Sequence, residues 1–442
     1  MLDQTFDKIK NIHNLSELRL PILFFGFAVW FVTPIIGNIP ILLSIQLSLL
    51  TSKPQRKDLR AINNLLLILV VISSSIYISS LDIFADTKVY LDVYDSLDVK
   101  GIFDNEFYRD RYEFVLFLLL YPIHILTDGS EYLCLFLFSL IVNSTVVFYI
   151  SKNLSSKYYP TLLIVVFSTF FYYSQVFYMR QFLSIMLVMV ALVAIETSWS
   201  MFFVWSLLAI FSHSSAVMYV GVCLISKLAL SFKKNFKIKL RAVDKVFIYI
   251  ALIFLLGLIS YVAWLIYNNP QEIYSYTNNI IDLLPEKRLS SSIQGRVSAY
   301  DGRDTDLFDF NIFRIVATMT ICIFALLKRY KNLTPKLLSL NMIFIISLLQ
   351  IAFVMVTGFN QRIIYLYLVF YGFFLCIGLD ENDKIKPFGI ISLLTMFVAA
   401  ANTFNLLTIQ VGMADIKGWS FFDGQPLTMS IYDYIVYFFQ SM

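Results

Sequence analysis

Long apolar runs separated by polar segments repeat along almost the whole chain. Runs at 65–81, 133–150, 246–266 and 387–407 approach or reach the length of roughly 20 residues that crosses a hydrocarbon core as a helix. The pattern predicts an all-α, polytopic integral membrane protein in which residues 1–442 form a single membrane domain.

Composition supports this class and excludes others. Hydrophobic residues make up 59% of the 442 residues and charged residues 14%, with a mean hydropathy of +0.74. A soluble fold has too little interior to bury that much apolar surface. The net charge of +4 is modest and the basic residues are spread along the chain, so nucleic acid is not an expected partner. The four cysteines lie in apolar runs without paired spacing, which indicates neither a disulfide framework nor a zinc site.

Basic residues set the expected orientation. They gather in the segments 53–60, 227–245, 328–336 and 384–386, which the positive-inside rule places in the cytoplasm together with the N-terminus. The segments 82–112 and 268–309 are long and rich in Asp. We expect them to be the first periplasmic loop and a second, long periplasmic loop.

Two segments complicate the topology. The run 113–126 is short for a crossing, and 201–225 is broken in its middle by polar residues. If each crosses once, Lys152 and Lys157 lie outside and Arg180 inside. If neither makes a net crossing, both lysines lie inside and Arg180 lies at the outer face. We favour the second topology.

In that topology 113–126 is a re-entrant or interfacial helix, and 201–225 is a helical hairpin with His213 near its buried tip. Broken helices are tolerated at membrane depth only where protein or a water-filled cavity surrounds the freed backbone groups, so a cavity open to the outside is implied. The tail 409–442 is expected outside, ending in an amphipathic helix at 431–439. The remaining spans are expected at 20–34, 39–50, 62–81, 131–150, 159–178, 181–196, 246–267, 311–327, 337–357, 362–379 and 387–408.

Candidate chemistry rests on polar residues that membrane burial makes costly. Arg180 and Arg362 each stand at the outer start of an apolar run. A guanidinium offers a fixed fork of donors that suits a pair of phosphate oxygens, and two such groups on one face favour a diphosphate site. The alternative is that both are interfacial anchors whose side chains reach the headgroups.

Other candidates are His213, at the helix break, and the first outer loop with Asp86, Tyr90, Tyr112 and Glu113. The imidazole could hold a hydroxyl or phosphate or act as acid or base, and it could equally be a structural hydrogen-bonder. Carboxylates with tyrosines suit a sugar site, although loop acids are commonly only solvated.

The second outer loop contains Arg296 and Arg303 and is longer than a plain connection requires. These arginines could close over an anionic substrate. Arginines can neutralise the charge of an anionic substrate, and no pair of Asp residues has the spacing of metal ligands. We therefore expect no metal and no cofactor.

These features occur along the chain as an ordered set of short motifs. They are Asp86-x-x-x-Tyr90-x-x-x-Tyr94, Tyr112-Glu113 opening an apolar run, Arg180-Gln181 heading a helix, the sequence 211–216 (FSHSSA), and Arg362-x-x-Tyr365. The set resembles the EpsG-like group of Wzy-type polysaccharide polymerases across about residues 82–379. Relatives often have Ala after the Arg-Gln pair where this chain has Ser184, a mild departure.

The resemblance implies a GT-C-like polymerase architecture with about 11–12 transmembrane helices plus re-entrant or broken helices. It also implies a location in the bacterial inner membrane. The implied activity joins undecaprenyl-diphosphate-linked oligosaccharide repeats, as donor and acceptor, into O-antigen (lipopolysaccharide), capsule or exopolysaccharide at the periplasmic face. Membrane lipid and a chain-length regulator protein are further candidate partners.

The resemblance also suggests roles for individual residues. Glu113 or Asp86 would orient the acceptor hydroxyl, and His213 would help to position a substrate. The diphosphate and glycan would be bound by a larger set, namely Arg180, Arg362, Arg296, Arg303, Tyr90, Tyr112, Gln181 and Tyr365.

Two other classes remain open. A transporter or flippase of lipid-linked glycan would use the same cavity and basic residues, but it should show internal repeats, and none is clear. A membrane-bound acyltransferase would make His213 catalytic, and it would need a companion polar residue deep in the bilayer.

Overall fold

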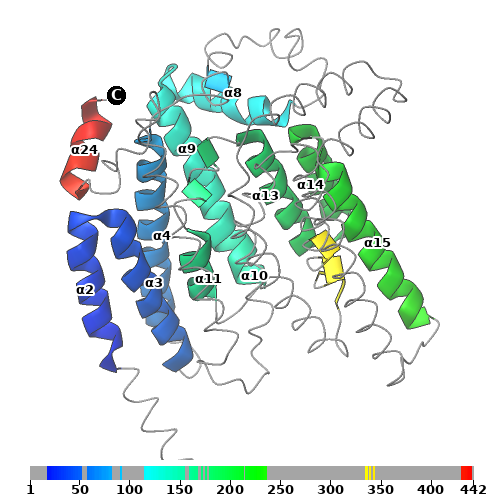
Figure 1. The fold of residues 1–442 in the computed structure, drawn as a ribbon, viewed down its shortest axis with the longest axis horizontal. Helices are drawn as coiled ribbons and strands as arrows, with labels where there is room; N and C mark the ends of the chain where they lie inside the picture. The colour runs from blue at the N-terminus through cyan, green and yellow to red at the C-terminus, as the bar shows by residue number, and fades with distance from the viewer. Residues whose placement is uncertain are drawn as a thin grey trace, which may run out of the picture. The chain divides into compact units, whose positions relative to one another are not determined.

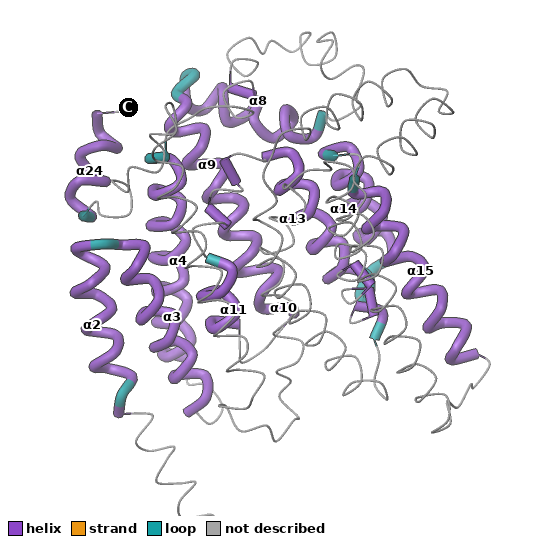
Figure 2. The backbone as a smooth tube through the Cα atoms, viewed as in Figure 1, coloured by secondary structure: helices purple, strands orange, loops and turns teal. Residues whose placement is uncertain are grey.

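The computed structural model describes seven stretches of the chain. They are residues 17–51, 57–81, 90–91, 114–154, 159–235, 334–343 and 430–440. Within 159–235 the description excludes residues 168–170, 173–174, 177–178 and 214, and within 334–343 it excludes residues 337 and 340–341. Every regular element in these stretches is a helix (Figures 1 and 2), as the sequence predicts. Contacts divide the chain into two compact units, residues 1–220 with 369–442, and residues 221–368. The features below belong to the first unit unless stated.

The helices follow the apolar runs closely. Their bounds are α2 Arg19–Val32, α3 Pro34–Thr51, α4 Lys57–Ser79, α8 Val115–Thr127, α9 Glu131–Ser144, the π-helix η1 Thr145–Ser151, α10 Lys152–Leu154, α11 Tyr159–Val166, α13 Met179–Ala194, α14 Trp199–Ser212, α15 Ala216–Asn235 and α24 Ile431–Gln440.

Two helical stretches are long and apolar enough to cross a membrane, Lys57–Ser79 and Glu131–Ser151. Six shorter apolar helices of 10–17 residues accompany them in the described residues. The expected spans at 246–267, 311–327, 362–379 and 387–408 lie outside the described residues, so the total number of spans stays a prediction. Helix α8 has 13 residues, fewer than a straight crossing needs, which fits a re-entrant or interfacial helix.

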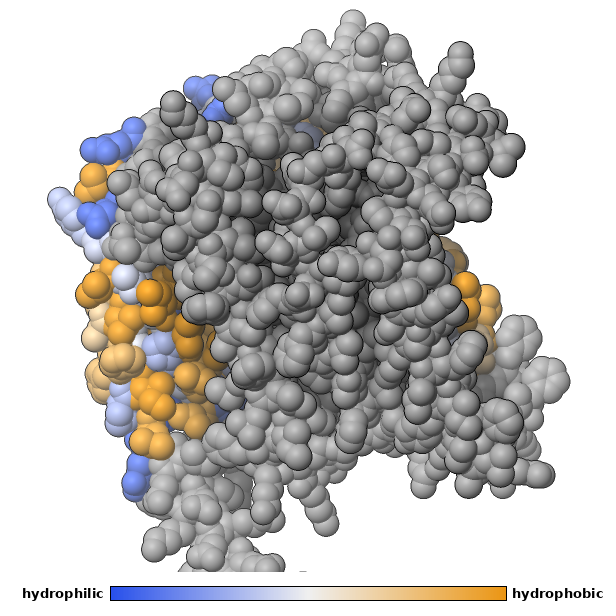
Figure 3. Space-filling model, in the orientation of Figure 1, coloured by the Kyte–Doolittle hydropathy of each residue, from blue (hydrophilic) through white to orange (hydrophobic). Residues whose placement is uncertain are grey.

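Large apolar side chains cover the outward face of the α2–α3 pair (Figure 3). Phe24 is 71% exposed and Phe25 64% exposed. Exposed aromatic rings in such number would cost free energy in water, whereas lipid tails solvate them. This face is therefore suited to the hydrocarbon core.

The α2–α3 hairpin depends on one glycine. Thr33 leaves the helical conformation (φ −143°, ψ 89°) and Pro34 starts α3, a position where its missing N–H is not needed. Gly37 then lies so close to α2 that a Cβ there would be 2.4 Å from the Cα of Trp30. Since the obstacle is backbone, the two helices would have to separate.

We expect Gly37→Ala to destabilise the protein by at least about 1 kcal/mol, because overpacking forces the backbone apart. Gly221→Ala is the matched control, since nothing lies within 4 Å of a Cβ at that helical position. Thermal unfolding in detergent checks this. Equal melting midpoints for Gly37→Ala and Gly221→Ala would contradict the close approach of Gly37 to α2.

A buried chain of polar side chains joins α3, α4 and the segment before α13. Ser73 Oγ donates to Asn38 Oδ1 at 3.0 Å, and Asn38 Nδ2 donates to Ser74 Oγ at 3.4 Å. Ser74 Oγ is in turn hydrogen-bonded to Tyr172 Oη at 3.1 Å. All four residues are buried, so these bonds hold the segments in register as interhelical hydrogen bonds do in membranes.

A second branch reaches α9. Asn143 Nδ2 donates to Ser75 Oγ at 3.0 Å, and Gln175 Nε2 donates to Asn143 Oδ1 at 2.9 Å. At the far end of α9 and η1, Lys152 Nζ donates to Asn64 Oδ1 at 2.9 Å. Helices α4 and α9 are therefore antiparallel, and the Lys152 side chain at the start of α10 reaches α4 at Asn64. Gln175 is bonded to Asn143, near the middle of the continuous helical stretch 131–154, whereas Lys152 lies near the end of that stretch.

The C-terminal helix α24 contacts α2 and α4 and exposes Tyr432, Ile435 and Phe439. Asp433 Oδ2 accepts from Ser430 N, and Ser430 Oγ accepts from Asp433 N, which is a reciprocal cap on the first turn. An apolar, capped surface helix is as expected for 431–439, and its periplasmic location stays a prediction.

Candidate functional site

Arg180 occupies the second position of α13, and its side chain is buried, 8% exposed. Its Nε donates a hydrogen bond to Tyr90 Oη at 3.0 Å, and its Cζ lies 4.9 Å from the centroid of the Tyr90 ring. Tyr90 is itself 4% exposed. One tyrosine therefore fixes both the direction and the plane of the guanidinium, by a hydrogen bond and by its ring face.

The backbone around Arg180 is fastened to α14. Ser212 Oγ donates to the carbonyl oxygen of Arg180 at 3.1 Å, and Ser184 Oγ donates to the carbonyl oxygen of Ala209 at 3.0 Å. Both serines are fully buried. These two bonds hold the start of α13 against the end of α14, where the chain reaches His213.

His213 ends α14 in extended conformation (φ −160°, ψ 130°), and α15 begins at Ala216. The helix break expected at 212–215 is therefore confirmed. Ser215 donates its backbone N–H to His213 Nδ1 at 3.2 Å, and Ser215 Oγ lies 2.8 Å from the same nitrogen. Nδ1 thus accepts from the Ser215 N–H, which leaves Nε2 as the ring nitrogen that can donate. The half-buried ring is thus held so that Nε2 is its donor.

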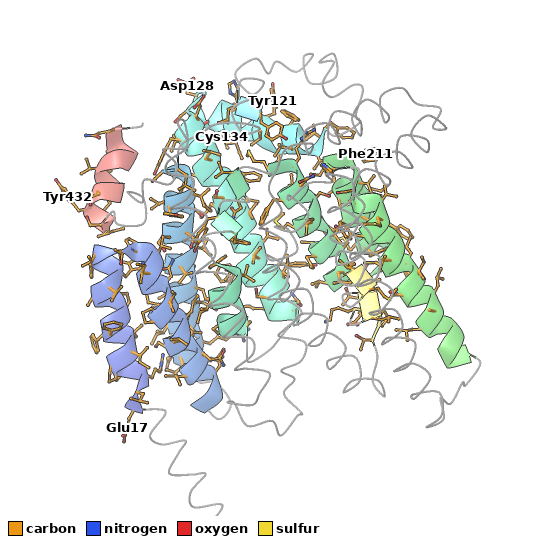
Figure 4. All side chains as sticks on the ribbon, in the orientation of Figure 1. Glu17, Tyr121, Asp128, Cys134, Phe211 and Tyr432 are labelled. Carbon is orange, nitrogen blue, oxygen red and sulfur yellow. The ribbon has the colours of Figure 1, made fainter. Side chains whose placement is uncertain are left out.

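An aromatic stack brings Phe114, just before α8, to the same place. The rings of Phe114 and Phe211 are stacked, with centroids 5.0 Å apart and planes at 29°. Figure 4 labels Phe211 at the end of α14 and Tyr121 on α8, at the same end of the helical layer. Phe114, which packs on Phe211, follows Glu113 directly in the chain.

The structure thus brings together Tyr90, Arg180 and the break at His213, which the sequence singles out separately. Gln181, the next candidate, is half-buried, and its Oε1 accepts no hydrogen bond from the part of the chain that the structure describes. The remaining candidates lie outside the described residues, and their placement stays a prediction: Asp86, Tyr112, Glu113, Arg296, Arg303, Arg362 and Tyr365.

Within the described ranges, no group of three His, Cys, Asp or Glu side chains could hold a metal ion. The charge available in the described part of the site is the Arg180 guanidinium. Its surroundings suit the binding of an anion, and the imidazole of His213, the residue after Ser212, adds a hydrogen-bond donor.

Several contacts were not anticipated from the sequence. Ser212 and Phe211 belong to a recognised motif, but their partners Arg180 and Phe114 were not paired with them. The polar chain through Asn38, Ser73, Ser74, Asn143 and Gln175 was not singled out at all. Its signal in the sequence is Ser, Asn and Gln inside otherwise apolar runs, where interhelical hydrogen bonds are common.

Ser184 provides a test of how tightly α13 and α14 fit. We expect Ser184→Ala to cost about 1 kcal/mol or less, since the carbonyl of Ala209 also accepts the N–H of His213 at 3.1 Å. Ser184→Leu should cost about 2 kcal/mol, because this fully buried side chain faces α14. Thermal unfolding of the two variants checks this, and equal melting midpoints would contradict the packing described here.

The sequence profile of the EpsG family matches residues 64–411, well over half of the chain and including every candidate site residue. Neither the curated proteins nor the solved structures contain a match to this chain. The resemblance inferred from the short motifs is thereby confirmed. The chain belongs to the EpsG family, a family of Wzy-like polysaccharide polymerases.

Proposed function

We propose that this protein polymerises lipid-linked glycans, and that Arg180, fixed by Tyr90, binds the diphosphate of the lipid-linked donor. The observation that carries the proposal is a buried guanidinium, held by a hydrogen bond and a ring face, at the start of a helix in a member of the EpsG family.

The chemistry requires charge neutralisation at the leaving group. In glycosyl transfer the bond between the anomeric carbon and the diphosphate oxygen breaks, and the anomeric carbon forms a new bond to the acceptor hydroxyl. The hydroxyl proton passes to a base, and the lipid diphosphate leaves with its additional negative charge. A cation fixed in advance in a low-dielectric site stabilises that developing charge more than a mobile one in water does.

Arg180 meets this requirement geometrically. Tyr90 accepts from Nε, and in this proposal a pair of phosphate oxygens contacts Nη1 and Nη2. Arg180 also lies in the first turn of α13, where the helix dipole favours a negative ligand. Arg362, with Arg296 and Arg303, supplies further positive charge in this proposal.

The acceptor side of the site would be formed by the helix break. Glu113 or Asp86 orients or deprotonates the acceptor hydroxyl, and the Nε2–H of His213 donates to a hydroxyl or phosphate oxygen. The Phe114–Phe211 stack supports this role, since it places the residue after Glu113 beside the His213 segment. Tyr90, Tyr112, Gln181 and Tyr365 complete the proposed contacts to substrate.

The finer assignments follow from family membership and the expected topology. The carrier would be undecaprenyl diphosphate, the reaction would take place at the periplasmic face of a bacterial inner membrane, and the fold would be GT-C-like. The product would be O-antigen, capsule or exopolysaccharide.

Purified protein in liposomes with one lipid-diphosphate-linked repeat unit tests the proposal against the transport alternative. If the protein is a polymerase, a ladder of longer lipid-linked glycans should form when the repeat units and the protein's active side face the same compartment. If the repeat unit crosses the bilayer but no longer glycan forms, the protein is a transporter and not a polymerase.

A further inference from the structure

A second cationic site lies at the end of the helical layer away from Arg180. Lys57, Arg60 and Asn64 are spaced i, i+3 and i+7 at the start of α4, which puts them on one face of the helix. Lys152 follows directly after η1 and reaches this face, where its Nζ donates to Asn64 Oδ1 at 2.9 Å. The Lys152 ammonium also lies 4.9 Å from the centroid of the Phe148 ring.

These contacts hold like charges together. Lys152 is half-buried, and partial burial and then the charge of Arg60 lower its pKa from the ordinary lysine value. Arg60 is also close enough for its charge to act on the Tyr159 hydroxyl. Bringing a lysine and an arginine together in a partly desolvated place costs free energy unless an anion joins them.

No carboxylate of the described part of the chain forms an ion pair with Lys152 or Arg60. Asp58 is the acidic residue nearest in sequence, and helical geometry turns it to a different side of α4 from the face that carries Arg60 and Asn64. The described protein therefore supplies donors and positive charge at this place without the matching anion.

The location indicates what the anion is. Among the described residues, two helical stretches are long and apolar enough to cross a membrane, and Lys57 begins one of them while Ser151 ends the other. The Lys152–Asn64 bond joins these two ends, so the cluster lies where the hydrocarbon core gives way to headgroups. Anionic headgroups bind between helices at such basic positions.

We propose that Arg60, Asn64 and Lys152, with Lys57 at the rim, form a binding site for a phosphate group, supplied by an anionic phospholipid of the adjoining leaflet. Lys152 and Arg60 would contact the phosphate oxygens, and Asn64 keeps the lysine in place. The site does not depend on catalysis and lies apart from the Arg180 end.

The purified protein is placed in nanodiscs that contain equal amounts of phosphatidylglycerol and phosphatidylcholine. Native mass spectrometry then measures which phospholipid stays bound when the protein is released from the nanodisc. We expect wild type to keep phosphatidylglycerol, and Arg60→Gln with Lys152→Gln to weaken its binding about fivefold for each basic side chain removed. Lys227→Gln with Lys336→Gln removes the same charge elsewhere and should leave retention unchanged. Lys152→Arg should keep most of it.

Two further arms make the outcome decisive. Inorganic phosphate added to phosphatidylcholine nanodiscs tests a soluble source. Suppose that phosphate raises the melting midpoint of wild type but not of the Arg60/Lys152 double variant, and that wild type and this variant retain the same amount of phosphatidylglycerol. The site then binds phosphate, and the lipid assignment fails. Equal loss of phosphatidylglycerol from both double variants would overturn the site as non-specific attraction. Should the Arg60/Lys152 variant not fold, Arg60→Gln alone decides, because Arg60 is exposed.

Discussion

Replacing Arg180 by alanine is expected to lower the rate of glycan lengthening by about 10³-fold or more, because the transition state loses a cation fixed beside the leaving diphosphate. Arg180→Lys should recover little, since an ammonium lacks the planar fork and cannot keep the Nε bond to Tyr90. The rate of ladder formation with purified protein and a lipid-diphosphate-linked repeat measures both.

Tyr90→Phe is the graded control for this prediction. It keeps a ring face against the guanidinium and removes the hydroxyl that accepts from Nε, so we expect about a tenfold lower rate and a loss of about 1–2 kcal/mol of stability, because the buried Nε–H loses its acceptor. Arg362→Ala should abolish the ladder as Arg180→Ala does, if both arginines bind the diphosphate. A folded Arg180→Ala variant that polymerises at the wild-type rate would remove Arg180 from the site.

Replacing Asn143 by alanine should destabilise the protein by about 2 kcal/mol, because the buried Gln175 amide loses its acceptor and Ser75 loses a donor. Interhelical hydrogen bonds in membranes are individually modest, and here one side chain joins α4, α9 and the segment leading to Arg180. We therefore also expect polymerisation to slow by several-fold.

Ser144→Ala is the matched control for Asn143→Ala. This neighbouring side chain is half-buried and makes no hydrogen bond to the described residues, so its loss should leave both the melting midpoint and the rate unchanged. An equal effect of the two substitutions would show that the polar chain does not stabilise the helical layer.

The sequence predicts those parts of the fold that depend on local pattern. The apolar run at 62–81 becomes the long helix α4, and the polar break after Phe211 ends α14. Arg180 is singled out because a charge at the edge of an apolar run is costly unless it has a role. Tyr90 is singled out because it stands with Asp86 in the segment 82–112, where carboxylates and tyrosines suit a sugar site. Such conclusions need only hydrophobicity and spacing.

What the sequence could not give is pairing over distance. Nothing in the spacing says that Tyr90 lies against Arg180, or that Ser75, Asn143 and Gln175 form one chain, because apolar helices in lipid can be rotated without changing their hydropathy. The close approach at Gly37 is similar, since it depends on the angle at which α2 and α3 cross. These features come from packing geometry.

The central claim, glycosyl transfer from a lipid diphosphate, is tested most directly by counting products. Wild-type protein is incubated with a single lipid-diphosphate-linked repeat, and free lipid diphosphate and new glycosidic bonds are measured in the same sample. The account predicts one lipid diphosphate released for each bond formed, and neither in Arg180→Ala. Longer glycans without matching release, or release without new bonds, would contradict it.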